Sequence, residues 1–135
     1  MAIISPFRAL RPAKDLASRV ASLPYDVLSS AEARVLAEKN PYSFLHITKS
    51  EIDLSEETDV HSEKVYHKAA DNLFIYRDNK ILIQEEQPAY YIYELTMGKR
   101  KQTGLVCVSS VKDYENNIIR KHELTRPEKE LDRIN

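Results

Sequence analysis

The sequence predicts an α+β fold, with a mainly antiparallel sheet and helices packed against it. In the first half, an apolar stripe at steps of three and four residues runs through residues 59–76 and predicts one long helix. In the second half, residues 89–97 are rich in tyrosine and β-forming side chains, and residues 102–110 return as their partner strand after a turn at Gly98. We therefore expect a single α+β domain over residues 1–135.

The first third of the chain predicts short elements separated by prolines. Ile3 and Ile4 form a short strand candidate that ends at Ser5-Pro6. Around residues 16–23, the apolar side chains fit either a short helical face or anchors within a loop. Ser29 and Glu32 have the spacing of a capping box, which predicts a helix that stops before Asn40-Pro41. The apolar side of that helix is expected at Ala31, Val35 and Leu36.

The middle of the chain predicts a strand, a loop and the long helix. Residues 42–49 alternate as a strand does, with Leu45 and Ile47 on one face and His46 and Thr48 on the other. Residues 50–58 are acidic and poor in apolar side chains, so we expect a surface loop. The apolar stripe of the helix that follows consists of Val65, Tyr66, Ala69, Ala70 and Leu73.

The second half predicts the sheet. Residues 81–83 form a short strand, and the two longer segments around Gly98 form a hairpin. Residues 105–108 are apolar at every position, which predicts a strand buried on both faces and a buried, unreactive thiol at Cys107. Residues 113–117 are expected to turn the chain toward the segment that follows.

Composition excludes several classes of protein. The chain has 20 basic and 21 acidic side chains, a balance that argues against a generic nucleic-acid surface. No apolar run reaches membrane-spanning length, so we expect no membrane partner. The single cysteine excludes an internal disulfide and fits a reducing compartment, so we expect a cytoplasmic protein.

The strongest candidate for a functional site is the segment of residues 118–130. Thr125 and Glu128 have capping-box spacing, and Pro127 stands where an early helical residue needs no amide donor. Free amides at a helix start with basic side chains beside them form a plausible anion site. The predicted site residues are Arg120, Lys121, His122, Glu123, Thr125 and Arg126.

A plainer interpretation fits the same segment, namely a capped surface helix beside a solvated charge cluster, because capping boxes are common. Other chemistries have less support. The four histidines lack the spacing of a metal site, and two glycines in the whole chain exclude a GxGxxG or Walker loop. The predicted last helix stops after barely two turns, so we expect the chain to be the N-terminal part of a longer protein.

Several blocks resemble a microbial domain-of-unknown-function family, number 1015. The first blocks are Pro24-Tyr25-Asp26-Val27, Asn40-Pro41 and Pro88-Ala89-Tyr90-Tyr91-Ile92-Tyr93-Glu94. The block His122-Glu123-Leu124-Thr125, followed by Pro127, Lys129-Glu130 and Asp132-Arg133, is similar to the family's His-Glu-x-Thr signature. The blocks occur in the family's order and cover nearly the whole chain. Asn116-Asn117 departs from the family where a glycine turn is common.

The resemblance implies a longer protein with a downstream Asp-Gly-His-His-Arg motif. That motif is similar to one in the ParB-like and sulfiredoxin-like superfamily, which includes partition proteins that hydrolyse CTP and kinases that phosphorylate free serine. The resemblance therefore implies a nucleotide-handling ancestry, with phosphate held by short turns at helix starts. It implies no established activity for the family.

Two functional hypotheses follow. In the first, the full-length protein is a nucleotide-binding enzyme, such as a small-molecule kinase that uses ATP or ADP with Mg²⁺. His122, Thr125 and the following amides would hold phosphate, Arg126 would balance its charge, and Glu123 would be a base or a magnesium ligand. In the second, the same cluster belongs to a non-catalytic regulatory module that binds a nucleotide or nucleic acid. We expect the chain alone to be inactive and to self-associate.

Overall fold

The computed structural model describes residues 1–120 and has the predicted α+β class, with helices and antiparallel strands. The described residues divide into two compact units, one made of residues 1–10 and 84–120 and the other of residues 11–83. Strands β2 (Leu10–Pro12) and β3 (Leu82–Gln84) pair with each other, and the division between the units falls within both. That residues 1–135 form a single domain stays a prediction.

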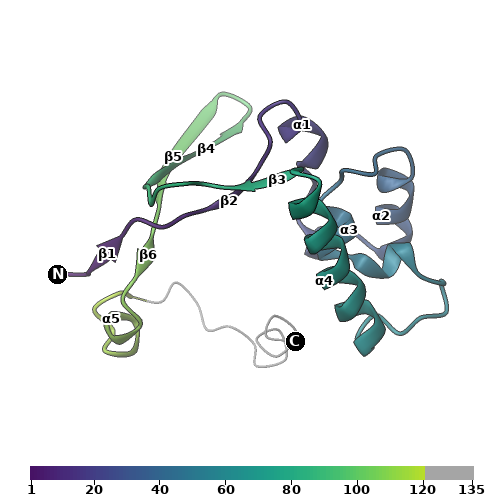
Figure 1. The fold of residues 1–135 in the computed structure, drawn as a ribbon. Helices are drawn as coiled ribbons and strands as arrows, with labels where there is room; N and C mark the ends of the chain where they lie inside the picture. The colour runs from purple at the N-terminus through teal and green to yellow at the C-terminus, as the bar shows by residue number, and fades with distance from the viewer. Residues whose placement is uncertain (121–135) are drawn as a thin grey trace. The chain divides into compact units, whose positions relative to one another are not determined.

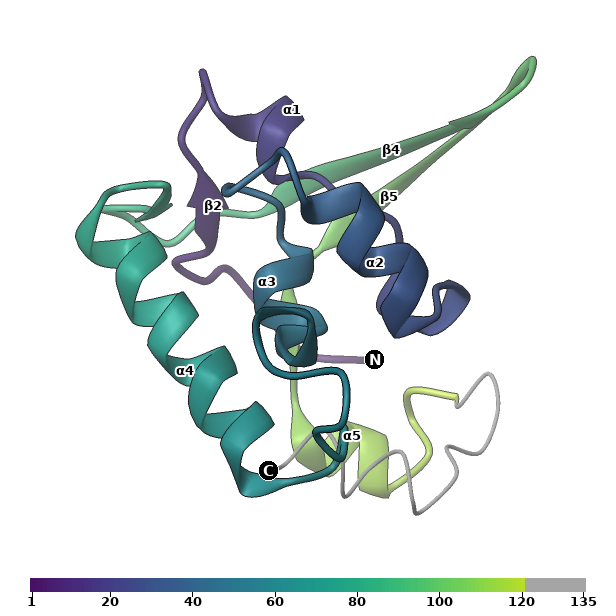
Figure 2. The same ribbon diagram turned by 90° about the vertical axis from the view of Figure 1, so that its right-hand side faces the viewer.

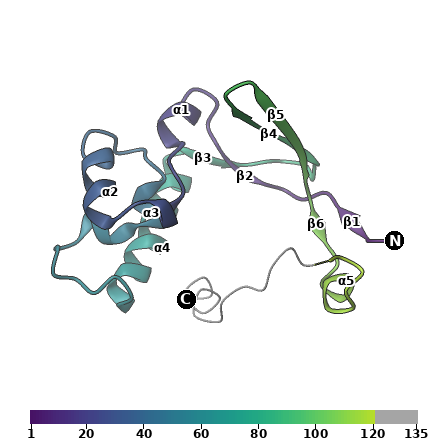
Figure 3. The same cartoon turned by 180° about the vertical axis from the view of Figure 1, so that it is seen from behind.

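The first unit contains the predicted hairpin. Strand β4 (Tyr91–Met97) pairs antiparallel with β5 (Arg100–Val106), and Gly98 has a φ of 60° in the two-residue turn between them (Figure 1). Two-residue hairpin turns need a positive φ, which glycine adopts without steric cost. The chain then continues through β6 (Val108–Ser109), which pairs with β1 (Ile4–Ser5), into helix α5 (Val111–Glu115) (Figure 3).

The hairpin corrects the prediction of a doubly buried strand. Leu105 is 53% exposed and Val108 is 46% exposed, while Cys107 is partly exposed. The physical reason is that β4 and β5 form a two-stranded sheet, with no third strand beside them among the residues described. Exposed apolar side chains and unpaired strand edges favour association, so they support the expected self-association, which stays a prediction.

The second unit is built from helices. They are α1 (Ala17–Val20), the 3-10 helix η1 (Tyr25–Val27), α2 (Ser30–Ala37), α3 (Leu45–Thr48), the 3-10 helix η2 (Ser50–Asp53) and α4 (Glu63–Asp78). Figure 2 shows α3 between α2 and α4, and α3 contacts both of them. One core cluster joins Val20, Tyr76, Ile81 and Leu82, and a second joins Ala33, Ala37, Leu45 and Ile52.

The prediction of a strand at residues 42–49 is wrong, because this segment forms α3 and leads directly into η2. Its apolar alternation spans only Leu45 and Ile47, which is too short to distinguish a strand from a helical turn. The surface loop expected at residues 50–58 is also wrong in its first part, where Ser50, Glu51 and Ile52 are buried.

Helix α2 confirms the predicted capping box but buries a different face. The Ser29 hydroxyl accepts a hydrogen bond from the Glu32 amide, and the Glu32 carboxylate accepts from the Ser29 hydroxyl and amide. These two hydrogen bonds hold the pKa of Glu32 below its ordinary value, and the bond from the Ser29 side chain has the larger effect. Val35 is 74% exposed, whereas Ala33 and Ala37 are buried because small side chains let α2 approach its neighbours closely.

Helix α4 confirms the long predicted helix, and its buried residues are Val65, Asn72 and Tyr76. The chain leaves this helix through Lys80, which has a φ of 56°. The Lys80 amide donates to the Arg77 carbonyl, and the Ile81 amide donates to the Tyr76 carbonyl. These two bonds form a Schellman motif, whose left-handed residue is usually glycine.

We predict that Lys80→Gly raises the free energy of unfolding by about 1 kcal/mol, because glycine relieves the steric cost of a left-handed backbone. Urea unfolding followed by circular dichroism measures the change. Lys80→Ala is the matched control and should have little effect, since alanine keeps the same steric cost. A destabilised Lys80→Gly variant would show that the backbone at this position is not strained.

Candidate functional site

The predicted anion site lies almost entirely beyond the part of the chain that the structure describes. Arg120 is described and is exposed. The other predicted site residues lie outside the described residues, so their roles stay predictions. They are Lys121, His122, Glu123, Thr125 and Arg126.

The structure does show how the chain enters this segment. Residues 113–117 were expected to form a turn, but α5 extends to Glu115 and ends in a second Schellman motif, in which Asn117 has a φ of 54°. The Ile118 and Ile119 amides donate to the Asp113 carbonyl at 2.9 and 3.1 Å. The buried Asp113 carboxylate in turn accepts from the Ile3 amide at 2.7 Å. The backbone is therefore fixed up to the residue before Arg120, and Asn117 suits the position because asparagine tolerates the left-handed conformation.

The 3-10 helix η2 is the centre of a polar network in the second unit. The Arg34 guanidinium donates to the backbone carbonyls of Glu51 and Leu54, each at 2.8 Å, and also to that of Ile52. The Ser50 hydroxyl is buried and donates to the Val65 carbonyl at 2.6 Å. These bonds attach η2 to both α2 and α4, so they fix the side chains on either side of it.

The charged side chains at η2 form a nearly buried pair. Lys49 Nζ lies 3.1 Å from Glu51 Oε1, and the two side chains are 14% and 9% exposed. The Ser30 hydroxyl donates to the same Glu51 oxygen at 2.7 Å. Buried ions require a partner or their desolvation penalty destabilises the fold, and here each ion compensates the other. Neither residue was predicted as part of a site.

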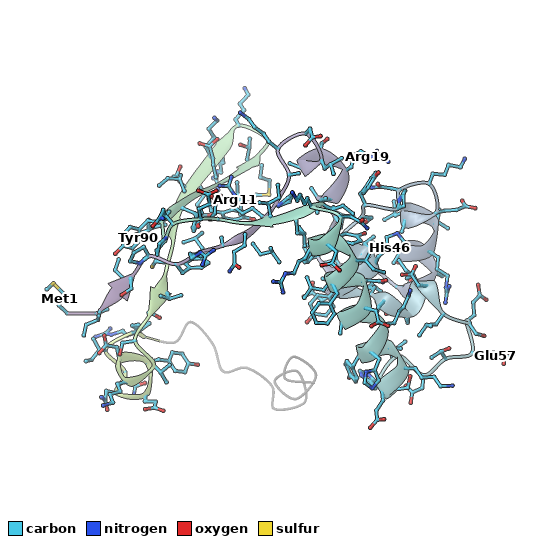
Figure 4. All side chains as sticks on the ribbon, in the orientation of Figure 1. Met1, Arg11, Arg19, His46, Glu57 and Tyr90 are labelled. Atoms are coloured by element: carbon cyan, nitrogen blue, oxygen red, sulfur yellow. The ribbon has the colours of Figure 1, made fainter. Side chains whose placement is uncertain are left out.

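His46, which is labelled in Figure 4, belongs to a second polar group that joins α3, η2 and α4. Its Nδ1 lies 2.8 Å from Asp53 Oδ1, and its Nε2 lies 3.2 Å from the Asn40 carbonyl. The buried Asn72 amide donates to Asp53 Oδ2 at 2.8 Å and to the His46 carbonyl at 2.6 Å. A histidine–aspartate pair is often catalytic, but this one holds α3, η2 and α4 together.

Tyr76 connects this group to the core. Its side chain is buried, and its hydroxyl donates toward the carbonyls of Pro41 and Ser43 at 3.0 and 2.9 Å. Burial, and then the negative charge of Asp53, raises the pKa of Tyr76 to about 12. The Asn40-Pro41 block therefore has a structural role, since Asn40 also donates from its side chain to the Arg19 carbonyl at 2.6 Å.

A cleft of about 470 Å³ lies beside η2, within the second unit. Its lining includes Tyr25 from η1, Ile47, Lys49 and Glu51 from the α3–η2 segment, and Val65 and Ala69 from α4. Clefts of this size that combine apolar walls with a few polar groups are typical small-molecule sites. Of these lining residues, Tyr25 belongs to the Pro24-Tyr25-Asp26-Val27 block that carries part of the family resemblance.

The described residues hold neither a metal cluster nor a membrane-spanning helix. Across residues 1–120, no three side chains of His, Cys, Asp or Glu are grouped so that they could hold a metal ion. None of the helices in that part of the chain is long and apolar enough to cross a membrane.

The fold and the cleft define an α+β protein with a cleft in its helical unit. The chain matches the model of the family described as "Protein of unknown function (DUF1015)" over residues 4–135, so it belongs to that family. No curated protein and no solved structure matches the chain. Family membership confirms the resemblance carried by the sequence blocks, while the relation to the ParB-like superfamily stays a prediction.

We predict that the stability of the second unit falls between about pH 10 and pH 12 because of Tyr76. Its pKa is raised to about 12 in the folded chain from an ordinary value of 10.0, so the unfolded tyrosine loses its proton first. The stabilisation is fully present below pH 10 and is lost as the pH rises through 12. Urea unfolding at a series of pH values should show a shallower alkaline loss for Tyr76→Phe than for the wild type.

At neutral pH, Tyr76→Phe should cost about 1 kcal/mol, which is the net contribution of one buried hydrogen bond. Tyr93→Phe is the control. Because Tyr93 is 56% exposed on the hairpin, this substitution should change neither the stability at neutral pH nor its loss at alkaline pH. Identical alkaline profiles for Tyr76→Phe and the wild type would mean that Tyr76 is accessible to water in the folded chain.

Proposed function

We propose that the protein binds the phosphate group of a nucleotide through residues 120–128. The observation that carries the proposal is the exposed Arg120, which follows directly after the backbone fixed by Asp113 and begins the basic His-Glu-x-Thr segment. Guanidinium groups bind phosphate oxygens through charge-assisted hydrogen bonds. The capping-box spacing of Thr125 and Glu128 supports a helix start, whose free amides also favour an anion.

In this proposal, the side chains of the segment either donate hydrogen bonds to phosphate or balance its charge. His122 and Thr125 donate hydrogen bonds to phosphate oxygens, and Arg120, Lys121 and Arg126 balance the negative charge. The nucleotide, ATP or ADP, would bind together with Mg²⁺, which is the counter-ion of its phosphates. The plainer alternative, a solvated charge cluster, predicts no preference for phosphate over other anions.

We further propose that the full-length protein transfers the terminal phosphoryl group to a small molecule such as a free amino acid. Glu123 would accept the proton of the acceptor hydroxyl, whose oxygen forms a bond to the terminal phosphorus as the bond to the departing nucleotide oxygen breaks. The support is the family's His-Glu-x-Thr signature, together with the downstream motif implied by the resemblance.

A non-catalytic regulatory module is the second candidate function. One observation favours it: His46 and Asp53, the histidine–aspartate pair of the helical unit, are engaged with Asn40 and Asn72 in holding the fold together. Incubating the full-length protein with radiolabelled ATP or ADP and a panel of free amino acids separates the two candidates. Labelled amino acid supports the kinase, whereas nucleotide binding without transfer supports the regulatory module.

We predict that inorganic phosphate shifts the amide NMR signals of residues 120–128. His122→Ala should weaken phosphate binding by about tenfold, the effect of losing one charge-assisted hydrogen bond. His67→Ala is the matched control, because His67 is an exposed histidine on α4 and should leave binding unchanged. Shifts confined to other residues, or equal shifts with sulfate and chloride, would contradict the proposal.

A further inference from the structure

We propose that the cleft beside η2 binds a ring that carries a vicinal diol, as in a sugar or a ribonucleoside. The cleft lies wholly within residues 11–83, and its volume is about 470 Å³. The cleft shares no residue with the segment proposed to bind phosphate, and this inference does not rest on that proposal.

Lys49 and Glu51 form an ion pair in the lining of the cleft, where the polar side chains of Thr48, Ser50, His61 and Tyr66 also lie. The charges of Lys49 and Glu51 cancel at a separation of 3.1 Å, so the pair suits a neutral ligand better than an anion or a cation. Glu51 Oε1 already accepts from Lys49 and Ser30, which leaves the second carboxylate oxygen, Oε2, as the acceptor for a ligand. An ammonium group has three donors, so Lys49 keeps donors for a ligand oxygen.

A donor and an acceptor side by side match the geometry of a vicinal diol. One hydroxyl of the ligand accepts from Lys49 Nζ, and the neighbouring hydroxyl donates to Glu51 Oε2. Acidic side chains bind ribose hydroxyls in this way in dinucleotide-binding folds. Because Arg34 holds the backbone of η2, the pair is positioned before a ligand arrives.

The rest of the cleft suits the apolar part of such a ligand. Ile47, Val65 and Ala69 supply aliphatic side chains, and Tyr25 supplies an aromatic ring. An aromatic ring can pack against the C–H face of a sugar or stack on a nucleobase. The cleft therefore combines an apolar wall for the ring with a neighbouring hydrogen-bond donor and acceptor for the diol.

The test uses three compounds without phosphate, so it is independent of residues 120–128. Adenosine should shift the methyl NMR signals of Ile47, Val65 and Ala69, and 2′,3′-dideoxyadenosine should bind at least about tenfold more weakly because it lacks the diol. Methyl β-D-ribofuranoside, which has the diol but no base, shows whether the cleft recognises a sugar or a whole nucleoside. Binding equal to that of adenosine indicates a sugar site, and weaker binding indicates a nucleoside site.

Two variants locate the binding. Ala69→Phe places a bulky side chain in the cleft and should abolish the shifts of Ile47 and Val65, whereas Ala70→Phe, at the next position of α4, should preserve them. Glu51→Gln should weaken adenosine binding about tenfold, and Lys49→Met provides a second test if Glu51→Gln does not fold. Absence of methyl shifts at millimolar adenosine, or equal binding of adenosine and its dideoxy analogue, would overturn the proposal.

Discussion

The helical unit depends on one interaction, the binding of three backbone carbonyls of the η2 region by the Arg34 guanidinium. Irregular backbone in a protein interior must find hydrogen-bond partners, and a 3-10 turn leaves several carbonyls without them. The guanidinium is planar and has five donors, so it can bond several adjacent carbonyls at once. A lysine ammonium lacks this planar arrangement of donors. Because these carbonyls are bonded, η2 can bury Glu51 and Ile52, and the short helix α3 can lie inside the unit.

This attachment also determines where chemistry can occur in the helical unit. One polar group, made of His46, Asp53 and Asn72, joins α3 to α4. The second, made of Lys49 and Glu51, lines the cleft as a compensated pair. The first group stabilises the fold, and the second keeps an acceptor oxygen and ammonium donors for a ligand. In the other unit, Asp113 plays a comparable structural part, because its carboxylate and carbonyl fix the chain that leads to Arg120.

Features encoded by neighbouring residues were predictable from the sequence. The Ser29–Glu32 capping box, the hairpin around Gly98 and the long helix α4 all depend on spacings of a few residues. The segment of α3 and η2 was not predictable, because its partners are distant: Arg34 lies 17 to 20 residues from the carbonyls it binds. Asn72 and Tyr76 were missed because a search for apolar periodicity overlooks buried polar side chains. Of the predicted site, the structure describes Arg120 alone.

Native-state amide hydrogen exchange in Arg34→Lys, which keeps the charge but removes the planar fork, tests the role of Arg34 most directly. Protection of the Ile52 and Leu54 amides, which donate to the Lys49 and Glu51 carbonyls, should fall by about tenfold or more. Arg77→Lys, a change of the same kind on α4, should leave that protection unchanged. Unaltered protection of Ile52 and Leu54 in Arg34→Lys would contradict the claim that this guanidinium holds η2 in place.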